Sequence, residues 1–196
     1  MRSPRCILFL GLLAALGLRG GELCAQPVMK KASELIQRQE PPLISPRVLE
    51  KITPENAEIR VSLRKQRAYL MEKGGGEIAI DTPISSGKAA GMTPPGKFRV
   101  QEKDADHRSN LYGNYVDARG RVVKAGVSVR IDSAPSGTRF EGAPMRWFLR
   151  INGPIGLHAG ILPGYPASHG CIRLPEEVAR LIYERSKIGT PVIIEK

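Results

Sequence analysis

The chain has 196 residues and a formal net charge of +11, with 41% hydrophobic and 25% charged residues. This size and ordinary globular composition exclude wholesale disorder and indicate one main domain. The many glycines and prolines, with only 5% aromatic residues, favour a β-rich or mixed fold over a helical bundle. The excess positive charge favours anionic surroundings, such as a wall polymer or a lipid surface.

The N-terminus has the pattern of a secretory signal. Two arginines precede an apolar run over residues 6–18, and such a run is too short for a bilayer span, which takes about 20 residues. With the small Ala25 before the cut, residues 1–25 are expected to be a signal peptide, and a retained anchor is the alternative. Export to the periplasm or cell envelope argues against a nucleic-acid partner. No later stretch is suited to a stable membrane span.

Signal cleavage would leave Cys171 as the single cysteine, a free thiol that is either reactive or paired with another molecule. Residues 26–57 are proline-rich and are expected to form a linker, with a short helix between Val28 and Ile36. The next segments alternate apolar and polar residues as strands do. The predicted strands cover residues 59–63, 68–71, 77–84, 97–101, 122–131, 145–151 and 191–194.

Two segments depart from this strand pattern. Residues 102–120 are polar and rich in Gly, Asn and Asp, which predicts a long loop that holds a solvated His107. Residues 175–187 begin with proline and two glutamates and carry one apolar face, which predicts the main helix.

The chemistry gathers around Cys171, because His158 and His169 lie within 13 residues of it. A free thiol is mostly protonated at pH 7, and a nearby imidazole can take its proton and hold the thiolate as an ion pair. Cysteine plus histidine is therefore the minimum set for acyl transfer through a thioester. The amides of Gly170 and Cys171 are candidates for an oxyanion hole.

Three other roles for Cys171 remain open. In the first, Cys171 is a buried structural thiol. In the second it binds zinc together with His158 and His169, although this spacing lacks the compact ligand pairs of zinc sites. In the third it is a redox thiol, although no resolving cysteine would remain after signal cleavage.

Residues 168–174 read Ser-His-Gly-Cys-Ile-Arg-Leu and resemble the signature of the L,D-transpeptidase catalytic domain, a family that builds and remodels peptidoglycan. The resemblance covers nearly all of residues 58–196, which are expected to be the catalytic domain. It implies an α+β, β-rich fold, a mixed β-sandwich or barrel-like sheet with one main C-terminal helix. The other segments similar to the family are residues 93–98, 145–148, 156–158 and 189–192.

The resemblance also implies roles for individual residues. Cys171 would be the nucleophile and His158 the general base and acid. The carbonyl of Ala159 would orient the His158 ring, at a position where the family more often has Gly or Ser. The remaining implied site residues are Ser168, His169 and Gly170, which shape the site, and Arg173 and Tyr165 as substrate contacts, with a loop anchor as the alternative for Tyr165.

The activity implied is formation of 3→3 cross-links between a donor tetrapeptide stem and an acceptor amine through a Cys171 thioester. If water attacks instead, the enzyme is an L,D-carboxypeptidase, and if a protein lysine attacks, it anchors proteins to the wall. No metal or organic cofactor is expected, and acylation by carbapenems is implied. A non-catalytic module that binds an anionic wall polymer is the alternative of another class, against which the presence of both His158 and Cys171 argues.

Overall fold

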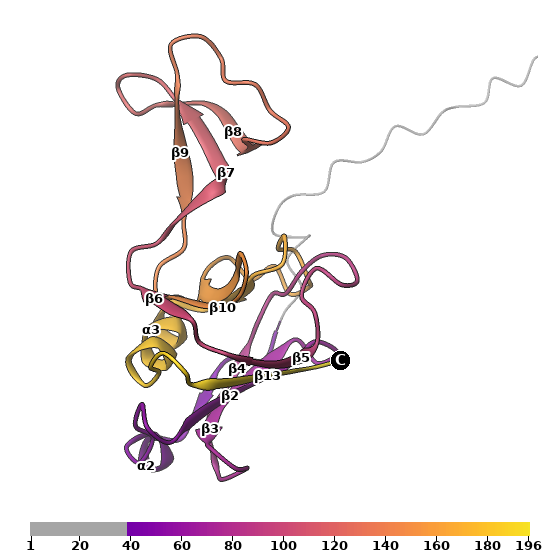
Figure 1. Cartoon of the computed structure of the whole chain (residues 1–196), viewed down its shortest axis with the longest axis vertical. Coiled ribbons are helices and arrows are strands. Elements are labelled where there is room, and N and C mark those ends of the chain that lie inside the picture. The colour runs from indigo at the N-terminus through magenta and orange to yellow at the C-terminus, as the bar shows by residue number, and fades with distance from the viewer. Residues whose placement is uncertain (1–38) are drawn as a thin grey trace, which may run out of the picture. The chain divides into compact units, whose positions relative to one another are not determined.

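The computed structural model of the chain describes residues 39–196 (Figure 1). The expected signal peptide, residues 1–25, and the expected helix between Val28 and Ile36 lie outside the described residues. Within the described range, no helix combines the length and the apolar character that crossing a bilayer requires.

The largest sheet has six strands in the order β1-β4-β3-β2-β13-β5. Alternating apolar and polar residues explain why these segments form strands with one buried face. In β2, Ile59 and Val61 are buried, while Arg60 between them faces outward. The C-terminal strand β13 lies parallel to β2 and antiparallel to β5, so the two ends of the domain share one sheet. The strands are β1 (Leu43–Ile44), β2 (Ala57–Ser62), β3 (Arg67–Glu72), β4 (Ile78–Pro83), β5 (Gly96–Arg99) and β13 (Pro191–Glu195).

A second sheet has four strands in the order β12-β11-β10-β6, and the helix α3 (Glu176–Glu184) follows β12. Lys103 of β6 donates hydrogen bonds to the carbonyls of Tyr183 and Ser186 at the end of α3, where a cation complements the helix dipole. These strands are β6 (Glu102–Asp104), β10 (Phe148–Asn152), β11 (Ile155–Ala159) and β12 (Ile172–Leu174).

A third sheet has the order β8-β7-β9, with β7 (Arg108–Val116), β8 (Val122–Ser128) and β9 (Arg139–Pro144). The prediction of a long loop over residues 102–120 is therefore wrong, because this segment contains β6 and β7. Their exposed polar side chains hide the alternation, and pairing with β9 and β10 makes them strands. The backbones of β7 and β9 also approach each other closely at Gly113, where a Cβ would lie 2.1 Å from the Glu141 carbonyl oxygen.

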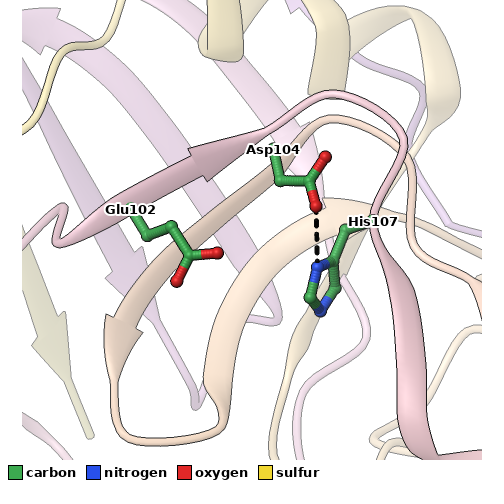
Figure 2. A group of neighbouring side chains, drawn as sticks. All are labelled: Glu102, Asp104 and His107. Atoms are coloured by element: carbon green, nitrogen blue, oxygen red, sulfur yellow. Dashed lines mark hydrogen bonds and ion pairs between the residues drawn. The ribbon is translucent and has the colours of Figure 1, made fainter.

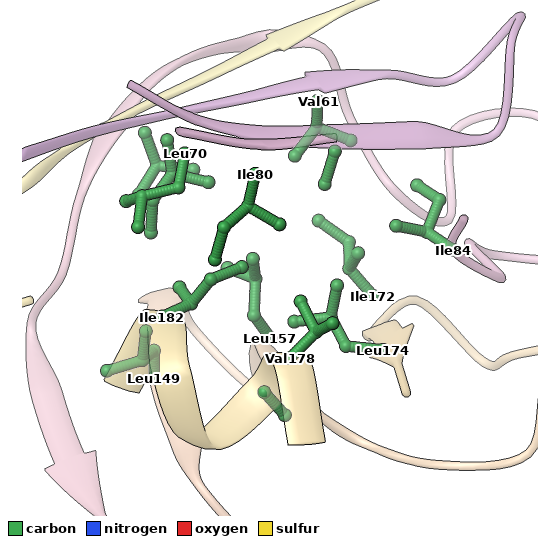
Figure 3. Close-up of a cluster of buried hydrophobic side chains, with 14 of the residues drawn as sticks. Val61, Leu70, Ile80, Ile84, Leu149, Leu157, Ile172, Leu174, Val178 and Ile182 are labelled. Carbon is green, nitrogen blue, oxygen red and sulfur yellow. The ribbon is translucent and has the colours of Figure 1, made fainter. Parts of the chain in front are cut away.

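The hydrophobic core lies between the six-stranded sheet, the four-stranded sheet and α3 (Figure 3). Leu70 and Ile80 come from the first sheet, Leu157 and Ile172 from the second, and Ile182 from the helix, and each is fully buried. Burial of each such side chain stabilises the fold by about 1.5–3 kcal/mol. Because Leu157 and Ile172 are core residues, their neighbours on β11 and β12 are held on a rigid base.

The described part of the expected linker packs on the domain. Strand β1 pairs with β4, and the single-turn helix α2 (Pro46–Leu49) follows it. Leu49 and Ile52 are buried in the same core. The predicted fold class is confirmed, since the chain is β-rich with one main helix near the C-terminus, of nine residues.

Candidate active site

Strand alternation places the reactive side chains on one face of the parallel pair β11 and β12. His158 is opposite Arg173 in the register, and Leu157 is opposite Ile172. Because successive side chains point to opposite faces of a sheet, Leu157 and Ile172 enter the core while His158 and Arg173 face away from it. Cys171 precedes Ile172 and therefore lies on the same face as His158.

This face forms part of the wall of a cavity of about 1020 Å³. Five of the residues expected from the sequence line it together with Ala159. Gly170 and Tyr165 are not among the lining residues. The Tyr165 carbonyl accepts a hydrogen bond from Ser85 Oγ at 2.8 Å, which is the contact of a loop anchor. The five lining residues are His158, Ser168, His169, Cys171 and Arg173.

The His158 ring is held by its own neighbour. Its Nδ1 lies 2.8 Å from the Ala159 carbonyl oxygen, so Nδ1 carries the proton and Nε2 is left with its lone pair. The side chain is only 7% exposed, and burial lowers its pKa to about 4, with the positive charge of Arg173 acting in the same direction. His158 is therefore neutral at pH 7, as a general base must be.

The Cys171 thiol is protonated in this state. Its Sγ lies 3.6 Å from the Pro154 carbonyl oxygen, in a weak S–H···O contact. Burial raises the pKa of the thiol, while the Gly156 amide and the Arg173 charge act against that rise. Both pKa shifts favour the neutral thiol and imidazole over the expected ion pair, and they favour proton transfer as the sulfur attacks a substrate.

Hydrogen bonds inside the loop before Cys171 fix the backbone of the nucleophile. Ser168 Oγ donates to the Cys171 carbonyl at 2.5 Å and accepts from the Gly170 amide at 3.0 Å. Thr93 Oγ1 donates to the Gly170 carbonyl at 2.7 Å. The Gly170 amide is therefore already bonded, and the expectation that it lines an oxyanion hole does not fit this geometry. Thr93, from the Thr-Pro-Pro-Gly segment, is a brace that sequence reasoning missed.

His169 is held between two other segments at the cavity wall. Lys88 Nζ lies 3.3 Å from its Nε2, and the Tyr112 ring of β7 stacks on it with centroids 4.2 Å apart and planes at 13°. Burial lowers the pKa of His169, and the Lys88 charge lowers it further. This matches a residue that shapes the site. No local sequence pattern pointed to Lys88 or Tyr112.

Positive charge dominates the cavity. Four arginines line it, and Glu176 is the acidic residue among the lining groups. Arg146 pairs with Glu176 at 3.2 Å, and Arg150 pairs with Glu102 at 2.7 Å. Arg173 is half-buried, and within residues 39–196 it has no ion-pair partner. The cavity therefore suits a ligand that carries carboxylates.

The prediction of a solvated His107 is wrong. Its ring stacks on the buried Phe148, with centroids 4.2 Å apart, and it lines the same cavity as Cys171. The one sequence feature that could have indicated a held His107 is Asp104, three residues before it. The Asp104 Oδ2 and His107 Nδ1 atoms lie 3.0 Å apart.

A sequence-family model described as the L,D-transpeptidase catalytic domain matches residues 56–194. The chain belongs to this family. Members of the family are typically cysteine enzymes that act on peptidoglycan peptides. No curated protein matches the chain.

Solved structures of L,D-transpeptidases share the fold. The enzyme from Mycobacterium smegmatis is 18% identical with a TM-score of 0.53, over 72% of this chain and 59% of that one. The enzyme from Xylanimonas cellulosilytica is 23% identical with a TM-score of 0.50, over 71% and 60%. An LD transpeptidase in complex with imipenem is 18% identical with a TM-score of 0.52, over 72% and 59%. This chain thus spans less than two thirds of each.

Proposed function

We propose that this family member is a peptidoglycan L,D-transpeptidase that forms 3→3 cross-links through a thioester on Cys171. The observation that carries the proposal is the shared cavity wall of Cys171 and His158, with His158 Nδ1 tied to the Ala159 carbonyl. A neutral imidazole with a free Nε2, on the same cavity wall as a protonated thiol, has the state that acyl transfer requires.

The first half-reaction joins the donor stem to the enzyme. The Cys171 sulfur attacks the carbonyl carbon of the bond between an L-centre and a D-centre, and His158 Nε2 takes the thiol proton. When the tetrahedral intermediate collapses, the C–N bond breaks and His158 gives that proton to the departing amine of D-alanine. In the second half-reaction an acceptor amine attacks the thioester carbon. A new C–N bond forms, the C–S bond breaks, and the amine releases its surplus proton while the Cys171 thiolate regains one.

The charge of the cavity supports a peptide donor with free carboxylates. Arg173 stands beside the reactive pair without an acidic partner within the described residues, and a bidentate contact to a carboxylate would satisfy its guanidinium. An anionic wall polymer is a further partner that suits the net charge. This charge is +11 for the whole chain and +9 once the expected signal peptide, with three arginines and one glutamate, is removed. The signal-like N-terminus supports action in the periplasm or cell envelope.

The test is mass analysis of the products from purified wall fragments. The proposal predicts 3→3 cross-linked dimers with the unaltered protein and none with Cys171→Ala. Trimmed tripeptides without dimers would indicate an L,D-carboxypeptidase, and stem peptides joined to a protein lysine would indicate an anchoring enzyme. Absence of all three products would favour the alternative function, a non-catalytic module that binds the wall.

A further inference from the structure

A second imidazole belongs to the wall of the active-site cavity. His107 follows β6, and its ring lies at 13° to that of Phe148, with centroids 4.2 Å apart. The Phe148 ring also lies 6.3 Å, centroid to centroid, from the His158 ring, at a tilt of 44°. Phe148 is fully buried. One buried aromatic ring therefore stacks on His107 and is also a neighbour of His158.

Asp104 fixes the orientation of the His107 ring (Figure 2). Its Oδ2 lies 3.0 Å from His107 Nδ1, whereas the cavity lining includes His107 but not Asp104. A carboxylate at Nδ1 favours the tautomer with its proton on Nδ1 and leaves Nε2 with a lone pair. In the part of the chain that the structure describes, His107 Nε2 has no hydrogen-bond partner. It is therefore free to meet a ligand in the cavity.

Figure 2 also shows Glu102, whose contacts distinguish between a metal site and a proton-transfer pair of Asp104 and His107. The ligand atoms of Glu102, Asp104 and His107 lie within 4.8 Å of one another. However, Arg150 Nε donates to Glu102 Oε2 at 2.7 Å, and this hydrogen bond lowers the pKa of Glu102. A cation would have to displace Arg150 and break the bond between Asp104 and His107. The arrangement therefore favours proton transfer by His107.

We propose that His107 is the general base for the acceptor amine and that Asp104 is its positioning residue. This inference rests on the proposed transpeptidase function. As the acceptor nitrogen bonds to the thioester carbon, its surplus proton passes to His107 Nε2. The C–S bond then breaks, the Cys171 thiolate takes a proton from water, and His107 returns one to water, so that protons balance over the step.

A division of labour between the two histidines has a physical reason. His158 is only 7% exposed, so water has little access to its ring during the second half-reaction. The His107 side chain is 21% exposed, so water can reach it and remove the proton. The donor side then depends on His158 and the acceptor side on His107.

The experiment measures the two half-reactions separately. Acylation of Cys171 by a donor tetrapeptide is followed by intact mass, and aminolysis of the isolated thioester is followed with a stem-peptide amine as the acceptor. For His107→Gln we expect the aminolysis rate constant to fall about 10²-fold, while acylation stays within about twofold. Asp104→Asn should lower aminolysis in the same direction. Added imidazole should restore aminolysis in His107→Ala, which a purely structural role would not allow.

Asp106→Asn is the matched control, because it makes the same chemical change on an exposed residue of the same turn and should leave both steps unchanged. Unchanged aminolysis in both His107 variants, or an equal loss of acylation, would overturn the inference. So would loss of wild-type aminolysis on chelation and its return with zinc. If the unaltered protein is not acylated at Cys171, the proposed function itself fails, which is a separate result.

Discussion

The two walls of the active-site cavity are built in different ways. The inner wall consists of β11, β12 and the loop before Cys171, where His158 is 7% exposed and hydrogen bonds to backbone groups hold each reactive residue. The outer wall consists of the turn after β6 and the strand β7, where His107 and Tyr112 are partly exposed. There, contacts between side chains hold the residues.

This difference separates two tasks. A residue that is braced by the core and by backbone hydrogen bonds opens only when the domain unfolds, whereas exposed edges open at much lower free energy. The covalent step at Cys171 needs fixed geometry, and the inner wall provides it. The outer wall is more exposed, so we expect it to open more easily and to admit a donor and then an acceptor. Changes in the inner wall should therefore affect rate and stability strongly, and changes in the outer wall should be smaller and selective.

Loss of the inner-wall base should have the largest effect. His158→Gln removes the acceptor of the thiol proton, and acylation of Cys171 should slow about 10³-fold, within the range for general-base catalysis. Stopped-flow or mass-resolved acylation by a carbapenem measures this rate. A rate within tenfold of the unaltered protein would show that His158 is not the base.

The same histidine should make stability depend on pH. The pKa of His158 is about 4 in the folded chain against 6.5 when unfolded, so the unfolded state binds a proton first as the pH falls. Stability should therefore decrease between pH 6.5 and about 4, by about 3 kcal/mol at the lower limit. Urea unfolding at several pH values should show this loss in the unaltered protein and much less in His158→Gln. If stability depends on pH in the same way in both proteins, burial of His158 does not lower its pKa as described.

Gly170→Ala tests the loop of the inner wall. Gly170 has a φ of +132°, and a Cβ there would lie 2.8 Å from the Met92 carbonyl oxygen. We expect a loss of about 2 kcal/mol in the free energy of unfolding, together with slower acylation. Gly74→Ala is the control, since Gly74 also has a positive φ but no atom within 4 Å of its Cβ position. Equal losses in the free energy of unfolding for the two variants would show that the close contact with the Met92 carbonyl is not the cause.

Tyr112 tests the outer wall, where the smallest effect is expected. Tyr112→Ala removes the ring that stacks on His169. An aromatic pair contributes about 0.5–1.5 kcal/mol, so the free energy of unfolding should fall by no more than this. Because His169 is then less firmly held, kcat/KM should fall by at most about tenfold, mainly through KM. Tyr112→Phe keeps the ring and should behave as the unaltered protein does. A large loss of kcat in Tyr112→Ala would contradict a role limited to holding His169.

Sequence reasoning succeeded where one face of an element is buried. The strands β2, β3 and β13 and the helix α3 carry apolar residues at the spacing of their elements, and each was predicted to within a few residues. The strands β6 and β7 were missed, because their side chains are polar and exposed and pairing with β9 and β10 decides their conformation. Long-range pairing of this kind leaves no periodic signal in the segment itself.

The same limit applies to the site. Cys171 and its neighbours form one contiguous motif, so the reactive thiol was found from the sequence. Thr93, Lys88 and Tyr112 reach the catalytic loop from distant segments, and only the folded structure brings them together. The amide of Gly170 was misassigned because sequence alone does not reveal that Ser168 Oγ accepts from it.

The most direct test of the account is acylation of Cys171. The full-length protein is incubated with a carbapenem, its intact mass is measured, and the adduct is located by digestion. One adduct on the peptide that contains Cys171, absent in Cys171→Ala and formed slowly in His158→Gln, is the predicted result. No adduct, or an adduct that persists in Cys171→Ala, would contradict the assignment of Cys171 as the nucleophile.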